Sequence, residues 1–387
     1  MLIGTESLNG GSSKFLRPST RYSRARDVIF VRPNFRLNAL GLLALKSLSE
    51  SAHPPSSGNY ALSDIIAALD WVQVNIRNFG GNPNSVTLVG HRAGATLVTA
   101  LTSSAKASKL FTRAWVSSGS AVFPKKSLDE SERLNKLYED KLNCTTKSCL
   151  QTLDAESIIK EIPDTWRSND LLGLPTTDES TKERHEWLVL DGHILKKSPV
   201  DVLKAQVNQA PKLVMGSTSH ESHSEALMAL NKEWTVEIIR AYVDNSIIGQ
   251  MNLTDEALKR YGTTYQGLIA MISDIRTICP LLNLAKSQQN VPFYCVTQTG
   301  GALNVADVNS DVQAILGRYE PKTPEERRYV QAIQSLFYYY VSHGSVNYYT
   351  QQKPVLDIGQ DVIAKEEYPN CDFWITNNIV PQYAKID

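Results

Sequence analysis

The feature that most constrains the fold is a short apolar run that turns sharply into a helix of small residues. Residues 86–90 read Val-Thr-Leu-Val-Gly, a pattern typical of a buried strand, and residues 93–101 follow as a helix. Gly90 and Gly94 flank the turn, which is too tight for side chains at those two positions. A buried strand that passes directly into a helix predicts a layered α/β structure.

Strands and helices alternate along the rest of the chain. Apolar residues at helical spacing predict a helix from Ile65 to Ile76, and a capping box at Thr323–Glu326 opens another helix that stops at Gly344. Further buried strands are expected at residues 1–3, 28–31, 114–116, 212–216 and 293–297. This alternation predicts one α/β domain over residues 1–387, with a mostly parallel central sheet and helices on both faces.

Charge and composition exclude several classes of function. The 387 residues include 40 Lys+Arg and 40 Asp+Glu, so no positive excess supports nucleic-acid binding. The arginine-rich segment 17–36 is interpreted as a solvated loop that leads into a strand. No run approaches the roughly 20 apolar residues of a membrane span, and residues 1–11 lack the pattern of a signal peptide.

The sequence predicts no metal or cofactor. The run His-Glu-Ser-His at residues 220–223 lacks the i, i+4 histidine spacing of a zinc-binding helix, so we interpret it as a loop that enters a helix. His91, beside the turn, is interpreted as filling space rather than acting as a nucleophile. The chain has no phosphate-binding loop and no glycine motif for a dinucleotide.

Arg92 occupies the apex of the turn, where a nucleophile elbow of the G-x-S-x-G type carries its serine. A guanidinium stays protonated in a protein and cannot attack a carbonyl carbon. The segment therefore predicts the architecture of an acyl-transfer site without its nucleophile.

Landmarks along the whole chain support a family resemblance. They lie at residues 35–41, 58–59, 71–73, 75–76, 79–83, 118–120, 190–192 and 198–199. On these residues the chain is identified as a member of the cholinesterase and type B carboxylesterase superfamily. The elbow Gly-His-Arg-Ala-Gly-Ala and the runs at 184–192 and 311–321 resemble its catalytically inactive, insect neuronal adhesion branch. The resemblance implies an α/β-hydrolase fold, in one carboxylesterase-type domain that lacks the family's N-terminal strands.

The resemblance also assigns the remaining catalytic positions. The acid corresponds to Glu221, and the base histidine corresponds to Val308 or an adjacent residue, since no histidine lies between residues 223 and 343. The glycine-rich turn of the oxyanion hole is expected at residues 5–7, which read Thr-Glu-Ser. The triad positions Arg92, Glu221 and Val308 are therefore degenerate, and hydrolysis by the triad mechanism is excluded.

The side chain of Arg92 has two alternative environments. An unpaired cation in the former catalytic pocket would be unfavourable, and an arginine is long enough to reach Glu221. We therefore expect an Arg92–Glu221 ion pair that fills the site. In the alternative, Arg92 turns toward solvent or toward backbone carbonyls.

The chain contains five cysteines. The resemblance implies disulfides Cys144–Cys149 and Cys279–Cys371, which leave Cys295 as a buried thiol within a strand. Such pairing requires an oxidising compartment.

Two sequons for N-linked glycosylation lie at Asn143 and Asn252. Together with the cysteines, they favour an extracellular location. The resemblance implies the cell surface, as the extracellular part of a single-pass type II plasma-membrane protein whose anchor lies upstream of this chain.

Three functional interpretations remain. The leading one is an inactive adhesion ectodomain that binds a secreted immunoglobulin-type protein resembling amalgam during nervous-system development, and the partner rests on resemblance alone. The second is a non-catalytic protein that binds esters or other small molecules in an open pocket. The third is an esterase with unorthodox catalytic residues.

Overall fold

The computed structural model describes residues 1–387 apart from 13–15, 167–172, 180, 182–183, 206–211 and 289–290. Within this part of the chain, one eight-stranded sheet has the order β2-β1-β3-β4-β5-β6-β7-β8. The six inner strands β1 and β3–β7 are parallel, and the two edge strands β2 and β8 are antiparallel to their neighbours. The strands are β1 (Leu2–Ser7), β2 (Gly10–Ser12), β3 (Thr87–Arg92), β4 (Arg113–Ser117), β5 (Lys212–Thr218), β6 (Phe293–Val296), β7 (Val355–Ile358) and β8 (Val362–Lys365).

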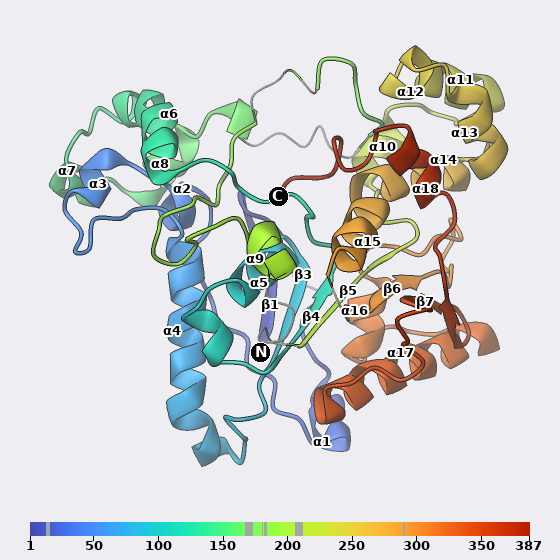
Figure 1. Cartoon of the computed structure of the whole chain (residues 1–387), viewed down its shortest axis with the longest axis horizontal. Helices are drawn as coiled ribbons and strands as arrows, with labels where there is room; N and C mark the ends of the chain where they lie inside the picture. Colours follow the sequence, from blue (N-terminus) through green and yellow to red (C-terminus); the bar gives the residue numbers. More distant parts are fainter. Residues whose placement is uncertain (13–15, 167–172, 180, 182–183, 206–211, 289–290) are drawn as a thin grey trace.

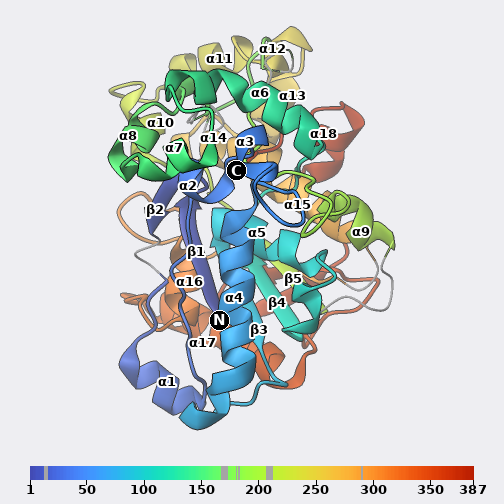
Figure 2. The same ribbon diagram turned by 90° about the vertical axis from the view of Figure 1, so that its left-hand side faces the viewer.

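Helices cover both faces of this sheet (Figures 1 and 2). Those before β5 are α1 (Thr20–Arg26), α2 (Asn38–Leu42), α3 (Lys46–Ser49), α4 (Tyr60–Asn75), η1 (Ile76–Phe79), α5 (Ala93–Thr102), η2 (Ala107–Lys109), α6 (Leu128–Lys141), α7 (Lys147–Thr152), α8 (Ala155–Lys160), η3 (Asp164–Trp166) and α9 (Pro199–Ala205). Those after β5 are α10 (Glu225–Ala229), α11 (Val236–Asp244), α12 (Ile247–Gln250), α13 (Thr254–Tyr261), α14 (Tyr265–Ser273), η5 (Asp274–Ile278), α15 (Cys279–Lys286), α16 (Ser310–Ile315), α17 (Pro324–His343) and α18 (Cys371–Thr376).

The alternation of side chains along each strand divides the core into two layers. On one face, Trp115 and Tyr294 stack with ring centroids 4.7 Å apart, and Phe337 of α17 contacts Trp115 edge-on at 5.2 Å. On the other face, Val116 and Met215 pack in the larger core that includes α4, α5 and the long helical stretch α14–α15. The predicted mostly parallel sheet with helices on both faces is confirmed.

Two local predictions near the N-terminus are wrong. Residues 28–31 form no strand, because the backbone bond from Leu2 N–H to the Val31 carbonyl, 2.8 Å, is not continued into a ladder. The segment 17–36 contains α1 rather than only a loop. The guanidinium of Arg26, at the end of α1, lies 4.9 Å from the ring centroid of Tyr338, which ties this helix to α17.

The expected capping box is present at the start of α17. The Thr323 hydroxyl accepts from the Glu326 N–H at 3.2 Å, and the Glu326 carboxylate accepts from the Thr323 N–H at 3.2 Å. The helix ends at Gly344, whose φ of 66° is unfavourable for other residues.

No uninterrupted apolar run of membrane-spanning length is present in the sequence, but the helical stretch Tyr265–Lys286 is long and, on average, apolar enough to cross a membrane by length and composition alone. In this structure 89% of its apolar window is buried inside the protein, as in a core helix. A π-helical turn at Asp274–Ile278 interrupts it and places both Asp274 and Arg276 in the interior.

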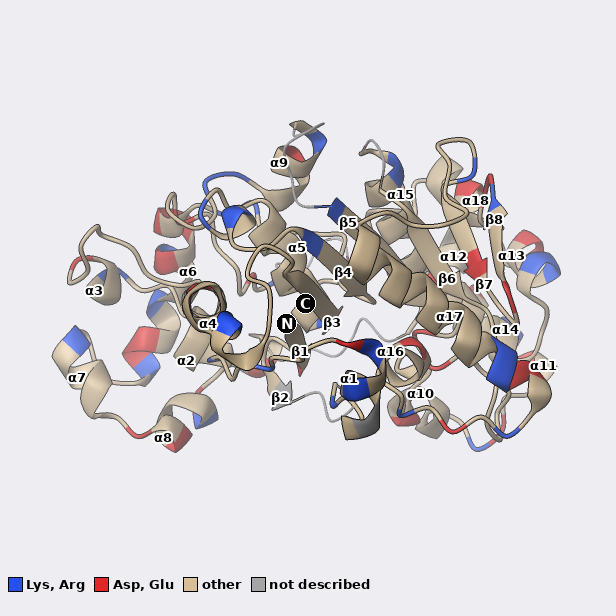
Figure 3. Cartoon of the chain, turned by 90° about the horizontal axis from the view of Figure 1, so that it is seen from below, with Lys and Arg blue, Asp and Glu red and all other residues tan. Residues whose placement is uncertain are grey.

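Charged side chains are concentrated on the peripheral helices and loops. Figure 3 shows Lys and Arg interspersed with Asp and Glu there, while the central strands are largely uncharged. The two signs occur in equal number over the whole sequence, with 40 Lys+Arg and 40 Asp+Glu.

Both disulfides are present, and Cys295 is a free, buried thiol. Cys144–Cys149 joins the segment after α6 to the first turn of α7, whereas Cys279–Cys371 joins α15 to α18 across 92 residues of sequence. The second bond therefore fixes the last helix, and the chain that follows it, against the core.

Replacing Cys279 and Cys371 together by serine should reduce the free energy of unfolding by about 4–5 kcal/mol, because the bond closes a long loop in the unfolded chain. Replacing Cys144 and Cys149 together is the matched control and should cost only about 2 kcal/mol. Denaturant unfolding of both double variants measures the difference. Equal losses would contradict the assignment of the long loop as the main covalent constraint.

Candidate functional site

The tight turn between β3 and α5 has the backbone geometry that a nucleophile elbow requires. Arg92 at its apex has φ 54° and ψ −129°, a conformation that costs a non-glycine residue roughly 1–3 kcal/mol. A Cβ at Gly90 would lie 2.6 Å from the Cα of Ala95, and one at Gly94 would lie 2.3 Å from the carbonyl oxygen of Ile3. The turn therefore retains the shape of an elbow, although its apex residue cannot act as a nucleophile.

His91, which precedes the apex, is directed into the core. Its Nε2 lies 3.0 Å from the carbonyl oxygen of Val308, and burial lowers the pKa of the ring to about 3. The neutral ring therefore donates from Nε2 to this carbonyl. Val308 is itself buried in the loop between β6 and α16, so a backbone contact to His91 occupies the position where the base was expected.

Glu221 lies just after β5 and is buried. The Ser217 hydroxyl donates to its Oε2 at 3.3 Å. Burial raises the pKa of this carboxyl group, whereas the nearby Lys385 ammonium opposes the rise. The site thus retains an acid at the expected position, supported from the end of β5.

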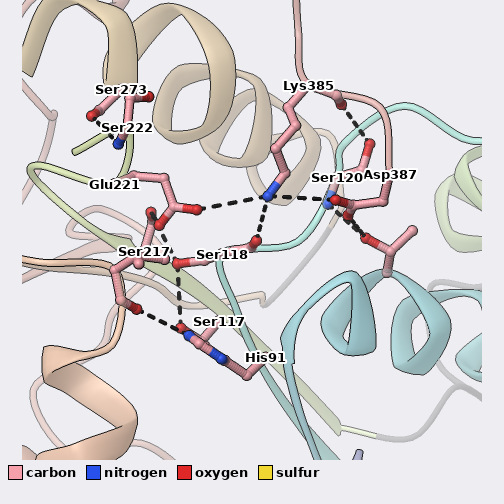
Figure 4. A network of polar contacts seen from close by, with 12 residues as sticks. His91, Ser117, Ser118, Ser120, Ser217, Glu221, Ser222, Ser273, Lys385 and Asp387 are labelled. Atoms are coloured by element: carbon pink, nitrogen blue, oxygen red, sulfur yellow. Dashed lines mark hydrogen bonds and ion pairs between the residues drawn. The ribbon is translucent and has the colours of Figure 1, made fainter. Parts of the chain in front are cut away.

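The expected Arg92–Glu221 ion pair is wrong. Within the described part of the chain, the cation that pairs with Glu221 is Lys385, whose Nζ lies 3.7 Å from Oε1 (Figure 4). The same Nζ donates to the Ser118 carbonyl at 2.9 Å and lies 3.6 Å from Oδ1 of Asp387. The C-terminal segment delivers this lysine from a distant part of the sequence, which no local pattern around Arg92 or Glu221 reveals.

Arg276 in the π-helical turn holds the C-terminal segment in place. Its guanidinium pairs with Glu179 through two hydrogen bonds of 2.6 and 2.9 Å, and it also donates to the Tyr383 carbonyl at 2.9 Å. The Arg276 carbonyl accepts from the Lys385 N–H at 2.8 Å, and the Ser120 hydroxyl donates to the Lys385 carbonyl at 2.7 Å. These bonds set the register that places the Lys385 side chain beside Glu221.

A second buried acid lies at the opposite end of a row of serines. Asp311 accepts from the Ser117 hydroxyl at 2.5 Å and from the Tyr294 hydroxyl at 2.7 Å. The row begins at Ser117, whose hydroxyl contacts that of Ser118 at 3.4 Å. The Ser118 hydroxyl in turn contacts that of Ser217, the residue that donates to Glu221, also at 3.4 Å. Burial raises the pKa of Asp311 to about 6.

The expected oxyanion turn is also wrong. Residues 5–7 extend β1 and form a hairpin with β2, in which Thr5 pairs with Ser12 and Ser7 pairs with Gly10. Because these residues are in a strand rather than a turn, they do not form the glycine-rich loop that an oxyanion hole needs. Glu6 is exposed at this edge.

His220, the first residue of the His-Glu-Ser-His run, has a structural role. His220 Nδ1 contacts the Ser219 hydroxyl at 2.9 Å and accepts from the Ala306 N–H at 3.2 Å, so it joins two loops. Across the described residues, no group of three or more His, Cys, Asp or Glu side chains could hold a metal ion.

Asn143 and Asn252 are both exposed, so their predicted glycosylation is sterically allowed.

Comparisons with known proteins agree with this architecture. A sequence model of the carboxylesterase family matches residues 1–361. Neurotactin of Drosophila melanogaster is 53% identical over 390 residues, covering 100% of this chain, and the chain spans 46% of that protein's length. Cholinesterase of Mus musculus is 26% identical over 419 residues, which cover 96% of this chain and 67% of that protein.

Solved esterase structures share the fold. A thermophilic pNB esterase superposes with a TM-score of 0.72 at 20% identity, over 97% of this chain and 79% of that one. A second pNB esterase structure gives a TM-score of 0.70, also at 20% identity, over 96% of this chain and 78% of that one. At this identity the likeness establishes the fold alone, and the predicted α/β-hydrolase fold is confirmed.

Asp311→Asn should remove a pH dependence of stability. Burial raises the pKa of Asp311 from 3.8 to about 6, so its contribution to folding stability is complete below pH 4. About 3 kcal/mol of folding stability is then lost as the pH rises through 6. Urea unfolding at pH 4 and pH 7 should therefore show a smaller fall in stability for the variant than for the wild type. Asp255→Asn, at an exposed ion pair with Arg240, is the control and should leave the fall unchanged. If Asp311→Asn loses as much stability between pH 4 and pH 7 as the wild type, the pH dependence does not arise from Asp311.

Proposed function

Because the chain belongs to the carboxylesterase family and carries Arg92 at the apex of its elbow, we propose that it is a catalytically inactive, cholinesterase-like cell-adhesion domain. The elbow is the observation that carries the proposal. Its backbone keeps the shape that presents a nucleophile, but the guanidinium there cannot attack an ester. Loss of one triad member typically lowers the rate of hydrolysis about 10⁴-fold or more.

The other catalytic positions support the same conclusion. At the base position the side chain of Val308 is apolar, and its backbone carbonyl already accepts from His91. The remaining acid, Glu221, is paired with Lys385 instead of orienting a histidine. A site with these three groups has no path for proton transfer from a nucleophile to a base.

The adhesion role rests on similarity to neurotactin. We propose heterophilic binding to a secreted immunoglobulin-domain protein resembling amalgam, in nervous-system development. The chain spans less than half of neurotactin, and the proposal assigns the binding of this partner to the shared domain.

The proposed location is the outer face of the plasma membrane. Two disulfides favour an oxidising compartment, and the exposed Asn143 and Asn252 are available for glycosylation there. The proposed arrangement is that of the extracellular part of a single-pass type II membrane protein.

A second candidate function is non-catalytic binding of an ester or other small molecule. A cavity of about 400 Å³ lies beside the loop that carries Val308, and its lining includes the polar side chains of His223, Asp307, Tyr319 and Glu326. A cavity of this size accommodates a small ligand.

The purified domain should hydrolyse an aryl ester no faster than buffer, because it has neither nucleophile nor base. Turnover is measured by release of the coloured phenol, and the Glu221→Gln variant is assayed in parallel. Turnover that disappears in Glu221→Gln would establish an active esterase and overturn the proposal. Calorimetric binding of the same ester without turnover would instead favour the second candidate.

Beads coated with the domain should cluster with beads that carry the secreted immunoglobulin-domain protein, but not with one another. Clustering is counted by microscopy at physiological salt. Beads coated with the pNB esterase, which shares the fold, are the matched control. Clustering that is equal for the two coatings, or absent for both, would contradict heterophilic adhesion through this domain.

A further inference from the structure

The ammonium group of Lys385 lies among three oxygen acceptors near the carboxyl ends of β4 and β5 (Figure 4). They are the Ser118 carbonyl at 2.9 Å, Asp387 Oδ1 at 3.6 Å and Glu221 Oε1 at 3.7 Å. A primary ammonium has three N–H donors and no acceptor, so the number and type of groups match. A guanidinium is planar and would not direct its donors to these positions in the same way.

The two acceptors outside the C-terminal segment, Ser118 and Glu221, belong to a rigid, buried framework. The Glu221 side chain is 5% exposed, and Ser118 and Ser217 are completely buried. Ser118 has a φ of 59°, which is unfavourable for a serine, and its N–H donates to the Gly216 carbonyl at 2.8 Å. Residues persist in such conformations only where the surrounding structure enforces them. The Ser118 carbonyl is therefore held at a fixed point of this framework.

We propose that the acceptors around Glu221 and Ser118 form a binding site for a primary ammonium group, which Lys385 fills from within the same chain. Glu221 forms the anionic wall of this site. The proposal goes beyond the adhesion role and does not depend on it. Two other charged groups also affect the pKa of Glu221: Arg92 lowers it and Asp311 raises it. Among the described residues, the cation in direct contact with Glu221 is Lys385.

The first test uses Lys385→Ala, which empties the site without adding bulk. n-Butylammonium should raise the melting temperature of this variant by about 2 °C or more at saturation, because it binds only the folded state. It should not change the melting temperature of the wild type, in which Lys385 already occupies the site. Lys365→Ala, which removes another partly exposed, paired lysine, is the matched control and should not respond.

Tetramethylammonium separates this site from a general cation effect. It carries the same charge but has no N–H to donate, so it should not stabilise Lys385→Ala. The proposal fails if n-butylammonium has no effect on the variant, if it acts equally on the wild type, or if tetramethylammonium acts equally well.

A second test avoids any change at Lys385. Glu221→Gln should weaken the hold on the C-terminal segment, so trypsin should remove residues 386–387 about tenfold faster than in the wild type. Mass spectrometry of the intact chain at early times measures this loss. Glu50→Gln, at an exposed pair with Lys46, is the control and should match the wild type. Equal rates for Glu221→Gln and the wild type would overturn the proposal.

Discussion

The close contact between the start of α5 and β1 is the constraint on which the site depends. Gly94 lies so near the Ile3 carbonyl that any side chain there would separate the helix from the strand. The contact fixes the turn at Arg92, the pairing of Thr5 with Arg92 across the two strands, and the position of His91 against the Val308 loop. The strained backbone at Arg92 therefore follows from packing, and it is present although a guanidinium cannot act as a nucleophile.

The charges of the site show how a buried carboxylate near the elbow is stabilised. A buried carboxylate is unfavourable unless a cation and hydrogen bonds compensate for the lost water. The compensating cation for Glu221 comes from the C-terminal segment, which Arg276 and Glu179 anchor deep in the interior. The cation at the apex of the elbow, Arg92, is thus not the one that pairs with Glu221, and the pairing cation, Lys385, is fixed by backbone bonds to the core.

Periodicity and local motifs predicted most of the architecture. The buried strand and small-residue helix around Gly90, and the capping box at Thr323, are encoded within a few residues and appear as expected. The pairing of Cys279 with Cys371 came from family resemblance, because spacing alone does not define a partner 92 residues away.

The failures share one physical cause, which is dependence on distant partners. Residues 28–31 are apolar enough for a strand, but in the described part of the chain their backbone bond to the sheet is the one from Leu2 N–H to the Val31 carbonyl. Residues 5–7 become a strand because β2 folds back on them. Lys385 looks like an ordinary polar residue near a terminus. Its role is visible only once β4, β5 and the π-helical turn bring Ser118, Glu221 and Arg276 together.

The Cys279–Cys371 bond has a mechanical consequence for a domain that is pulled from its two ends. Force would pass through the bond and bypass the chain between the two cysteines, which has a sequence separation of 92 residues. Fully extended, that segment would add about 300 Å of length. β6, β7 and α17 lie within the shielded loop, so stretching could unravel the strands before it while this part of the sheet stayed folded.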